Sequence, residues 1–483
     1  MIRLALLFLF LAVIIIYAWK DWYKSLCGLI LLMAVIEHPD MPKNILGVQG
    51  LNPWNIAFLF IALAWLVKRR NEGLRWDMPG HMNILLLLYL AVILISFARM
   101  MAVADKVIAT NFQDQLVMGS NEGLVGEYLI NTIKWVLPGL LLFDGCRSRS
   151  RLVWGLVALL GIYLLLGLQI IKWMPLSEAV SGTTLTARSL KIMKNEIGYH
   201  RVNLSMMMAG ASWAIFAASQ IFEERGKKLF CLLCALAVLI AQALTAGRAG
   251  YATWGVVGFM LCAIRWRKFL FLAPVVVFLL IVIIPGTRDR MTQGFSAETR
   301  DYNPRVATTQ RFEDEGPDLY TVTAGRNIAW PYVIDKIEDS PIIGYGRQAM
   351  ITTGVADFLW ERFRESFPHP HNAYLEMLLD NGLAGFLIVM TFYFVVLKKS
   401  VSLFRDSRNP IYVSTGGVAA ALVLALLVAS IGSQTFSPRE GAVGMWCAIG
   451  LMMRVSVERA RGKAVEGGEA DEGDIFREDT SIA

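Results

Sequence analysis

Residues 411–431 read Ile-Tyr-Val-Ser-Thr-Gly-Gly-Val-Ala-Ala-Ala-Leu-Val-Leu-Ala-Leu-Leu-Val-Ala-Ser-Ile and contain no charged side chain. About 20 apolar residues are enough to cross a bilayer, so this stretch predicts a transmembrane helix. Similar apolar stretches recur at residues 4–18, 56–67, 84–97, 152–168, 229–244, 269–285 and 383–397. The repetition excludes an ordinary soluble domain and predicts a protein that crosses the membrane many times.

Composition supports this interpretation. Hydrophobic residues make up 56% of the 483 residues and charged residues 18%, whereas about 25% of the residues in a soluble domain are charged. The predicted fold class is an all-α polytopic membrane protein with about 12–13 transmembrane helices and one large periplasmic loop domain. The net charge of +7 is explained by basic loops on the cytoplasmic side of a membrane rather than by nucleic-acid binding.

Lysine and arginine cluster in alternate connections between the apolar stretches, and such connections are normally cytoplasmic. They contain Lys68, Arg69, Arg70 and Arg75; Arg147, Arg149 and Arg151; Arg225, Lys227 and Lys228; Arg265, Arg267 and Lys268; Lys398, Lys399, Arg405 and Arg408; and Arg454, Arg459, Arg461 and Lys463. The other connections are then external: residues 37–53, 99–125, 169–200, 245–250, 286–370 and 431–440. Residues 286–370 contain 10 Lys or Arg against 13 Asp or Glu, as expected of a translocated segment.

The chain divides into four predicted parts. Residues 1–285 form the N-terminal transmembrane helices, 286–380 the large periplasmic loop, 381–455 the C-terminal transmembrane helices, and 456–483 a disordered cytoplasmic tail. We expect the first apolar stretch to be retained, because Ala18-Trp19-Lys20-Asp21 is a poor signal-peptide cleavage site. The orientation of the N-terminus stays open, because Arg3 favours the cytoplasm while the alternation of loops favours the outside.

Metal binding is not predicted. The six cysteines lie in or beside apolar segments, and Cys231-x-x-Cys234 lacks a second pair that would complete a zinc site. The acidic run Glu313-Asp-Glu315 offers no good case for coordination. His369-Pro-His371 lacks a third ligand. We therefore expect no metal and no cofactor.

His371 is the leading candidate for a general base. Pro368 and Pro370 precede it, Asn372 is a plausible helix N-cap, and a short helix over residues 373–380 is expected to break at Asn381-Gly382. His371 would then lie at the external membrane surface, where a base could act on headgroups. The alternative is an exposed loop histidine, and His369 competes for the same role.

Two arginines share an Ala-Gly-Arg sequence. Arg248 lies in the short connection at residues 245–250, and Arg326 lies in the large loop, where it opens an amphipathic stretch. A guanidinium binds diphosphate through paired hydrogen bonds and keeps its charge when partly desolvated. The alternatives are interfacial snorkelling for Arg248 and a solvated loop charge for Arg326.

Together these residues resemble the O-antigen ligase and O-antigen polymerase superfamily. His371-Asn372, followed after nine residues by Gly382-Leu-Ala-Gly385, is similar to its histidine motif. Gly325-Arg-Asn-Ile-Ala-Trp330, Pro341-Ile-Ile-Gly-Tyr-Gly346 and Ala246-Gly-Arg-Ala-Gly250 resemble its other conserved segments. The resemblance covers roughly residues 240–390 and is only topological elsewhere.

The resemblance implies a GT-C-like, metal-independent glycosyltransferase of the bacterial inner membrane with a periplasmic active site. It implies His371 as the base that activates an acceptor hydroxyl, and Arg248 and Arg326 as ligands of the undecaprenyl-diphosphate of a glycan donor. Arg201 is a further candidate for substrate binding, and Asn372, Gly382 and Gly385 are structural parts of the motif. The implied acceptor is a glycan or lipid A core, and membrane lipids surround the protein.

Three functions remain open at this point. The first is glycan transfer, by a ligase that moves a finished glycan or by a polymerase of O-antigen or exopolysaccharide repeat units. The second is a transporter or flippase, which would place charged residues within several spans, whereas the polar groups here lie mostly at span ends. The third is a scaffold, which does not require the arginine and histidine set.

The alternation of loops makes a direct prediction about topology. A reporter fused after Gly316 should read as periplasmic, and one fused after Arg461 as cytoplasmic, because only the second follows a basic connection. Paired alkaline phosphatase and fluorescent-protein fusions measure this. Two fusions that report the same side would contradict both the helix count and the placement of His371.

Overall fold

The computed structural model describes residues 2–45, 50–109, 111–112, 115–116, 120–295, 318–433 and 435–466. Part of the predicted loop, with Glu313-Asp-Glu315, lies outside these residues, as does most of the predicted tail. Within them the fold is helical apart from one antiparallel pair of two-residue strands, β1 (Asn111–Phe112) and β2 (Gln115–Leu116). The all-α prediction is confirmed.

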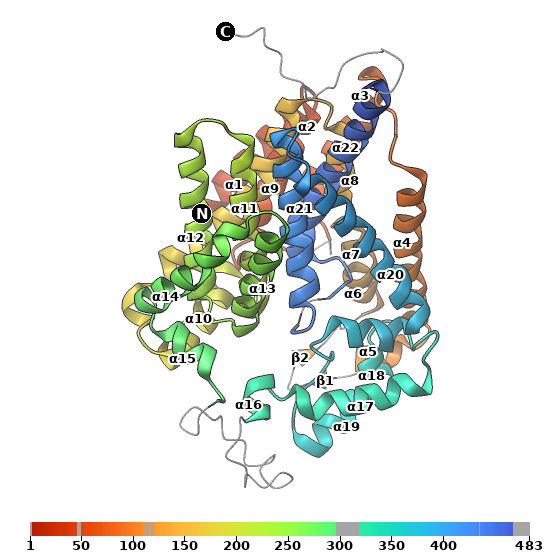
Figure 1. Ribbon diagram of the computed structural model, residues 1–483. Coiled ribbons are helices and arrows are strands. Elements are labelled where there is room, and N and C mark those ends of the chain that lie inside the picture. Colours follow the sequence, from red (N-terminus) through yellow and green to blue (C-terminus); the bar gives the residue numbers. More distant parts are fainter. Residues whose placement is uncertain are drawn as a thin grey trace.

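The first half of the chain forms the outer and central helices of a bundle (Figure 1). They are α1 (Ile2–Ala18), α2 (Trp22–Leu31), α3 (Pro53–Asn71), α4 (Gly80–Met101), α5 (Ala104–Ala109), α6 (Asn121–Val125), α7 (Asn131–Lys134), α8 (Leu137–Gly145), α9 (Arg149–Trp173), α10 (Gly182–Ile192), α11 (Arg201–Ala218) and α12 (Arg225–Leu244). A π-helical turn, Gly126–Ile130, joins α6 to α7, and another, Met193–Ile197, follows α10.

The second half completes the bundle and adds a helical cap at its lower end in Figure 1. Its helices are α13 (Arg248–Ile264), α14 (Ala273–Ile283), α15 (Gly286–Thr292), α16 (Leu319–Thr323), α17 (Arg326–Asp339), α18 (Ala349–Thr352), α19 (Val355–Phe363), α20 (Ala373–Arg405), α21 (Pro410–Ala429) and α22 (Val443–Glu466). The cap consists of α16 to α19. Because α22 continues to Glu466, the predicted disordered tail at residues 456–483 is helical in its first part.

Seven helical segments among the described residues are long and apolar enough to cross a membrane. They are Gly80–Met101, Arg149–Trp173, Arg201–Ile221, Arg225–Leu244, Ala373–Arg405, Pro410–Ala429 and Glu440–Gly462. Four further apolar helices are shorter, at 10–17 residues: Arg3–Ala18, Trp22–Val35, Arg248–Ile264 and Ala273–Ile283. The polytopic class is therefore confirmed, while the count of 12–13 crossing helices stays a prediction.

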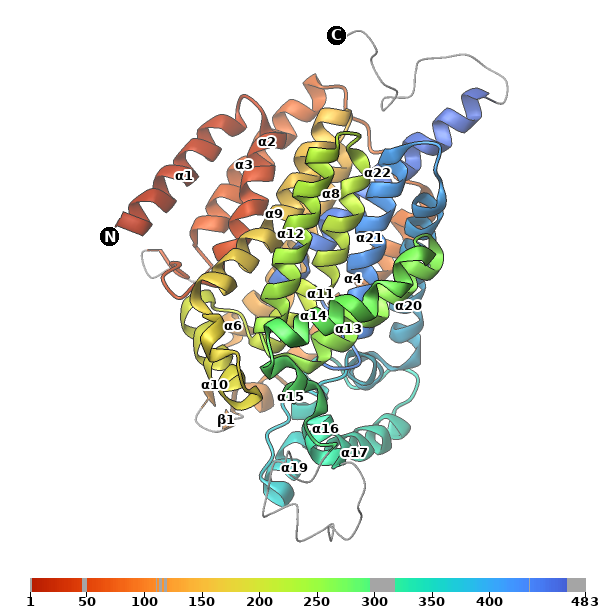
Figure 2. The ribbon, with the colours of Figure 1, turned by 60° about the vertical axis from the view of Figure 1, so that its left-hand side comes forward.

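Helices α11 and α21 form the centre of the bundle, since most residues in both are buried (Figure 2). Small side chains let two membrane helices approach closely and gain dispersion contacts, which drive packing where lipid replaces water. A Cβ atom added to Gly210 would lie 2.5 Å from the Cβ of Ala425, and one added to Gly417 would lie 2.7 Å from the Cβ of Ala217. The central pair therefore depends on glycine at these positions.

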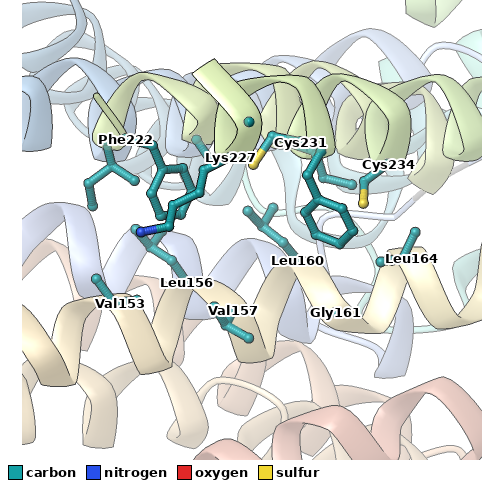
Figure 3. A pocket seen from close by; sticks show the side chains of 15 residues that line it. Val153, Leu156, Val157, Leu160, Gly161, Leu164, Phe222, Lys227, Cys231 and Cys234 are labelled. Carbon is teal, nitrogen blue, oxygen red and sulfur yellow. The ribbon is translucent and has the colours of Figure 1, made fainter. Parts of the chain in front are cut away.

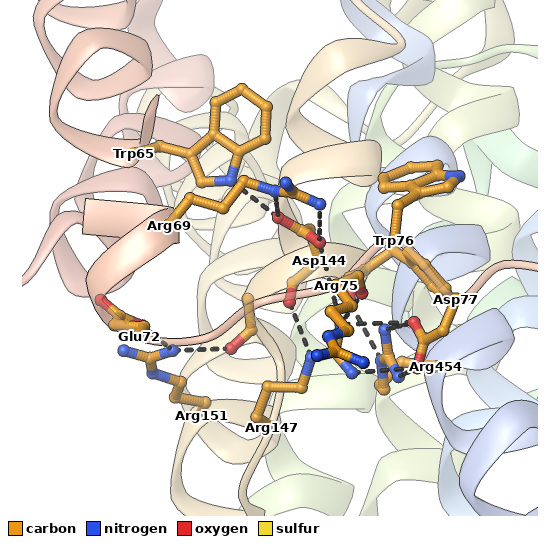
Figure 4. A network of polar contacts seen from close by, with 12 residues as sticks. Trp65, Arg69, Glu72, Arg75, Trp76, Asp77, Asp144, Arg147, Arg151 and Arg454 are labelled. Atoms are coloured by element: carbon orange, nitrogen blue, oxygen red, sulfur yellow. Dashed lines mark hydrogen bonds and ion pairs between the residues drawn. The ribbon is translucent and has the colours of Figure 1, made fainter. Parts of the chain in front are cut away.

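An ion-pair network joins the connections that follow α3 and α8 to α22 (Figure 4). The Asp77 carboxylate accepts hydrogen bonds from Arg454, at 2.5 and 2.8 Å, from Arg147, at 3.0 Å, and from Arg461, at 2.5 Å. Arg454 is fully buried and also donates to the Phe143 carbonyl. Burial opposes the charged form of Asp77, but the guanidinium groups of Arg454 and Arg147 hold its pKa below the usual value.

Further pairs extend this network between neighbouring connections. Asp144, also fully buried, accepts from Trp65 Nε1 at 2.9 Å and from Arg69 Nε at 2.8 Å. Arg151 pairs with Glu72 at 2.9 Å, and Arg459 pairs with Asp406 at 2.7 Å. Connections predicted to be cytoplasmic thus lie together at one end, and the last turns of α22 are held by the same contacts.

Breaking this network should destabilise the bundle. In Asp77→Asn the buried Arg454 loses its main counterion, so we expect a loss of about 3 kcal/mol in the free energy of unfolding. Asp40→Asn is the control, because Asp40 pairs with Arg3 at an exposed site where an ion pair contributes about 0–1 kcal/mol. Thermal and denaturant unfolding of the purified proteins in detergent measures both. Equal stability of the two variants would contradict a structural role for the network.

Candidate functional site

Arg248 is the first residue of α13 and follows a tight turn. Ala246 adopts a left-handed conformation, with φ 57°, and Gly247 is the N-cap. A Cβ atom at Gly247 or Gly250 would lie within 2.8 Å of Ser205 on α11. The two glycines therefore let α11 and the start of α13 touch, which fixes where Arg248 emerges.

The second Ala-Gly-Arg sequence repeats this arrangement at the start of α17. Ala324 is left-handed, with φ 54°, Gly325 is the N-cap, and Arg326 is the first helical residue. Arg326 Nε is buried and has no hydrogen-bond partner among the described residues. Burial lowers the pKa of Arg326. The helix continues to Trp330, whose Nε1 donates to the Pro370 carbonyl at 3.0 Å, so α17 is tied to the histidine segment.

Arg201 lies beside the turn that precedes α13. It is the first residue of α11, and its Nη1 donates to the Ala246 carbonyl at 2.9 Å. The guanidinium groups of Arg290 and Arg248 lie within electrostatic reach of it. Arg201 therefore joins Arg248 in one cationic group.

Arg248 connects this group to the helical cap. Its Nη1 donates to the Gln293 carbonyl at 3.2 Å and its Nη2 to the Thr321 carbonyl at 2.7 Å. Gln293 follows α15 and Thr321 belongs to α16, so one side chain touches both ends of the loop whose middle lies outside the described residues. The guanidinium is oriented by these bonds, as a preorganised anion-binding group requires.

His371 lies in a strained turn before α20. Its φ is 52°, a left-handed value that costs a non-glycine residue energy and is often found at functional sites. The His371 backbone N–H donates to Nδ1 of His369 at 3.4 Å, and the two rings lie 4.1 Å apart at 69°. Asn372 caps α20 by accepting from the backbone N–H groups of Tyr374 and Leu375, which confirms the predicted N-cap.

Both histidines are neutral at ordinary pH. Burial, followed by the charges of His369 and Arg326, lowers the pKa of His371 to about 3. Burial, followed by Arg439 and Arg347, lowers the pKa of His369 to about 4. A neutral imidazole can accept a proton, so both rings are in the state that a general base needs.

Helix α20 breaks at Gly382, as the sequence predicts, with φ 61° and ψ −170°. The segment Pro341–Gly346 packs across the break. Neither Gly382 nor Gly344 has room for a Cβ atom: one on Gly382 would lie 2.3 Å from the backbone of Ile342, and one on Gly344 would lie 2.6 Å from the backbone of Gly382. Four hydrogen bonds join the segment to the helix: Leu383 N to Pro341 O at 2.8 Å, Ala384 N to Ile342 O at 3.0 Å, Tyr345 N to Leu379 O at 2.9 Å, and Gly346 N to Asp380 O at 2.7 Å. A Cβ atom at Gly385 would press on Asn381 at 2.5 Å and on Val92 of α4 at 3.2 Å.

Sequence reasoning missed a buried ion triad beside this break. Arg347 pairs with Glu376 at 2.8 Å and with Asp380 at 3.3 Å, both on the first turns of α20. Asp380 also accepts from the Ala349 backbone N–H at 3.1 Å. The one signal in the sequence was that Arg347 directly follows Gly346. His200, which acts electrostatically on both histidines, was likewise missed although it precedes Arg201.

Four helix starts lie within electrostatic reach of one another in two linked groups. Arg201 and Arg248, which begin α11 and α13, act on each other, and Arg326, which begins α17, and His200, which precedes α11, both act on His371 before α20. Helix N-termini carry unpaired N–H groups and a partial positive charge, so they bind anions, and arginine adds full charges. The region suits an anionic group next to a neutral base. Within the described ranges no three His, Cys, Asp or Glu side chains group closely enough to hold a metal ion.

Comparison with known proteins finds its family match in the part of the chain that contains Arg248, Arg326 and His371. Residues 230–390 match the family model described as O-Antigen ligase. A protein of Rickettsia conorii, provisionally named a polysaccharide ligase, is 24% identical over 194 residues, which cover 39% of this chain and 43% of that protein. The exopolysaccharide production protein ExoQ of Rhizobium meliloti is 32% identical over 104 residues, which cover 20% of this chain and 24% of ExoQ. The matches thus span less than half of either relative.

Proposed function

We propose that this protein transfers glycan from undecaprenyl-diphosphate to an acceptor hydroxyl, with inversion at the anomeric carbon. The match of residues 230–390 to the O-Antigen ligase family model supports this proposal and agrees with the predicted superfamily. The reaction takes place at the periplasmic face of the bacterial inner membrane and uses no metal. In the ligase form of this proposal, the acceptor is lipid A core.

The observation that carries the proposal is the cationic group beside a neutral histidine. Arg201, Arg248 and Arg326 each start a helix, and Arg326 Nε lacks a partner among the described residues. A buried donor without a partner is costly, so such a group is expected to bind a ligand. A diphosphate offers several charged oxygen acceptors to such donors.

The bond changes follow from these positions. The acceptor oxygen attacks the anomeric carbon, the C–O bond to the diphosphate breaks, and the bonding electron pair leaves with the diphosphate oxygen. His371 takes the proton of the acceptor hydroxyl. The arginines stabilise the charge that develops on the leaving oxygen, which lowers the barrier by electrostatic preorganisation.

A polymerase of glycan repeat units is the alternative within the same chemistry. One relative is provisionally named a polysaccharide ligase and the other an exopolysaccharide production protein. The donor chemistry is identical in both cases, and the acceptor alone differs. Assays that offer lipid A core and a second lipid-linked repeat unit separately distinguish the two.

Arg326→Ala should reduce transfer about 10²-fold or more, since this is the usual effect of removing one preorganised donor. Arg326→Lys should rescue poorly, because an ammonium cannot form the paired hydrogen bonds of a guanidinium. Arg362→Ala, at an exposed position of α19 in the same cap, is the control and should stay near wild type. Initial rates with a lipid-linked glycan donor measure all three. Wild-type activity in Arg326→Lys would remove the diphosphate role of Arg326.

His371→Ala should lose transfer by about 10²–10⁴-fold, the usual contribution of a general base, yet still bind donor through the arginines. His369→Ala should lose far less. Donor binding and transfer, measured separately in both variants, test the assignment. A greater loss in His369→Ala, or an equal loss of binding and transfer in His371→Ala, would contradict it.

The lowered pKa of His371 predicts the pH profile. The base works only when neutral, so activity is retained above its pKa and lost as pH falls through it. With a pKa of about 3 in the free protein, kcat/KM should stay flat from pH 8 to about 5.5, where an unperturbed histidine with a pKa of about 6.5 would already be protonated. A fall of kcat/KM centred near about pH 6.5 would contradict the lowered pKa of His371.

A further inference from the structure

The connection between α21 and α22 lies against two helix starts of the candidate site. The backbone N–H of Ala373, at the start of α20, donates to the Ser430 carbonyl at 2.8 Å. A Cβ atom added to Gly432 would lie 3.3 Å from the Cβ of Ala249, at the start of α13. Arg439 lies at the far end of this connection, where it is the N-cap of a short 3-10 turn before α22. The connection therefore forms part of the surroundings of the site.

Arg439 is an exposed cation on the histidine side of this connection. After burial, its charge is the leading influence that lowers the pKa of His369, whose ring lies 4.1 Å from the ring of His371. Within the described ranges, the guanidinium of Arg439 has no hydrogen bond and no ion pair. Arg347 also acts on His369, but it is paired with two carboxylates of α20. The charge of Arg439 is therefore available to a ligand beside the histidines.

Glu440 does not neutralise Arg439, because the two side chains act on different groups. Burial and then Glu440 raise the pKa of Glu37 to about 7, and Glu440 also acts on Lys134. Arg439 is not among the leading charges on Glu37 or Lys134, and Glu440 is not among those on His369. These neighbours in the sequence thus face different parts of the protein, so a neutral substitution of Glu440 is a matched control for one of Arg439.

A polar wall lies within electrostatic reach of Arg439. Burial raises the pKa of Tyr128, while the charges of Arg347 and Arg439 oppose this rise. The Tyr128 hydroxyl accepts a hydrogen bond from Nε2 of Gln348 at 2.8 Å. Gln348 is half-buried and has a left-handed φ of 63°, a conformation that costs a non-glycine residue energy and is often found at functional sites. Gln348, His369 and Arg439 thus bring polar groups from three segments of the chain to one place.

The position of Arg439 fits the acceptor better than the donor. Arg290 and Arg248 are the cations that act on Arg201, and Arg439 is not among them. In the proposed reaction, inversion requires the acceptor oxygen to approach the anomeric carbon from the side opposite the leaving diphosphate. Groups that bind the acceptor are then expected near the histidines and apart from Arg201 and Arg248. Arg439 meets both conditions.

The apolar pocket between α9 and α12 does not offer such a site. It has a volume of about 340 Å³, and its walls include Leu160 and Cys231 (Figure 3). Lys227, which also lines it, pairs with Glu224. Lys227 lies near the start of α12, whereas Arg248 follows the end of that helix. The pocket therefore lies toward the end of the bundle that is remote from the histidines, and its walls do not suit a polar glycan.

We propose that Arg439 binds an anionic group of the acceptor glycan, either a phosphate monoester or a carboxylate, beside the hydroxyl that His371 activates. A guanidinium suits this role because it forms paired hydrogen bonds with both kinds of anion. This inference rests on the proposed function for the existence of an acceptor. It adds the place where the acceptor binds and a preference for acidic acceptors.

Arg439→Gln should raise the KM for the acceptor about tenfold, or about 1.4 kcal/mol, and leave the KM for the donor unchanged. Arg439→Lys should recover part of the loss, because an ammonium keeps the charge but not the paired hydrogen bonds. Added salt should raise the acceptor KM of wild-type protein more than that of Arg439→Gln, since it screens an exposed charge. Glu440→Gln should resemble wild type. Initial rates in nanodiscs, with lipid A core or a second lipid-linked repeat unit as acceptor, measure all of these.

Treatment of the acceptor identifies the anion. Removal of phosphate monoesters with a phosphatase, or methyl esterification of carboxylates, should abolish the difference between wild type and Arg439→Gln when it removes the group that Arg439 binds. A difference that survives both treatments overturns the proposal. An unchanged acceptor KM in Arg439→Gln, or an equal rise in the KM for the donor, also overturns it.

A binding measurement separates this proposal from the proposed function. Failure of wild-type protein to transfer glycan to either acceptor overturns the proposed function. Binding of each acceptor without donor, measured by thermophoresis, should still be about tenfold weaker in Arg439→Gln than in Glu440→Gln. Equal binding of both acceptors by these two variants overturns the acceptor site, whether or not transfer is observed.

Discussion

The position of His371 depends on how a broken membrane helix finds hydrogen-bond partners for its backbone N–H and C=O groups. A helix that crosses a bilayer must pair every N–H and C=O group, because no water is present to do so. At Gly382 the helix α20 stops following its own hydrogen-bond pattern, and the segment Pro341–Gly346 supplies the missing partners. The segment Pro341–Gly346 therefore completes the backbone hydrogen bonding of α20. The three N-terminal turns of α20, and the histidine turn before them, keep their direction only while that segment is docked.

The docked segment also explains why the site residues come from such different parts of the chain. Arg347 leaves the segment and pairs with Glu376 and Asp380 on the start of α20. Trp330, on the helix that Arg326 begins, bonds to the carbonyl of Pro370 next to His371. Backbone pairing, a buried ion triad and one indole hydrogen bond thus couple the two sequence segments that carry the arginine and the histidine.

Local signals were sufficient for much of this region. Asn372 as a cap and the break at Asn381-Gly382 follow from the preferences of single residues for turns and helix ends. The amphipathic stretch opened by Arg326 follows from the sequence pattern, whereas Arg248, predicted to lie in a connection, is the first residue of α13. The convergence of Arg201 with Arg248 could only be proposed, because it depends on glycines that let α11 and α13 touch. The triad around Arg347 joins residues about thirty positions apart in the sequence, and the spacing of apolar and polar residues along the chain does not predict such a pairing. The tail was misjudged at its start for the same reason, since ion pairs with distant residues extend α22.

The convergence of helix starts has a consequence for the end of the catalytic cycle. In a diphosphate that joins a polyprenyl chain to a glycan, each phosphorus carries one ester bond and shares the anhydride oxygen, so each has one ionisable oxygen. The leaving polyprenyl diphosphate instead exposes a terminal phosphate with a second ionisable oxygen that titrates near about pH 6, so it gains negative charge. If the proposed function holds, the same arginines and helix dipoles hold the spent carrier more tightly than the fresh donor. In the proposed reaction, the slow event of turnover is therefore the departure of the carrier into the bilayer, and free carrier competes with the donor for the protein.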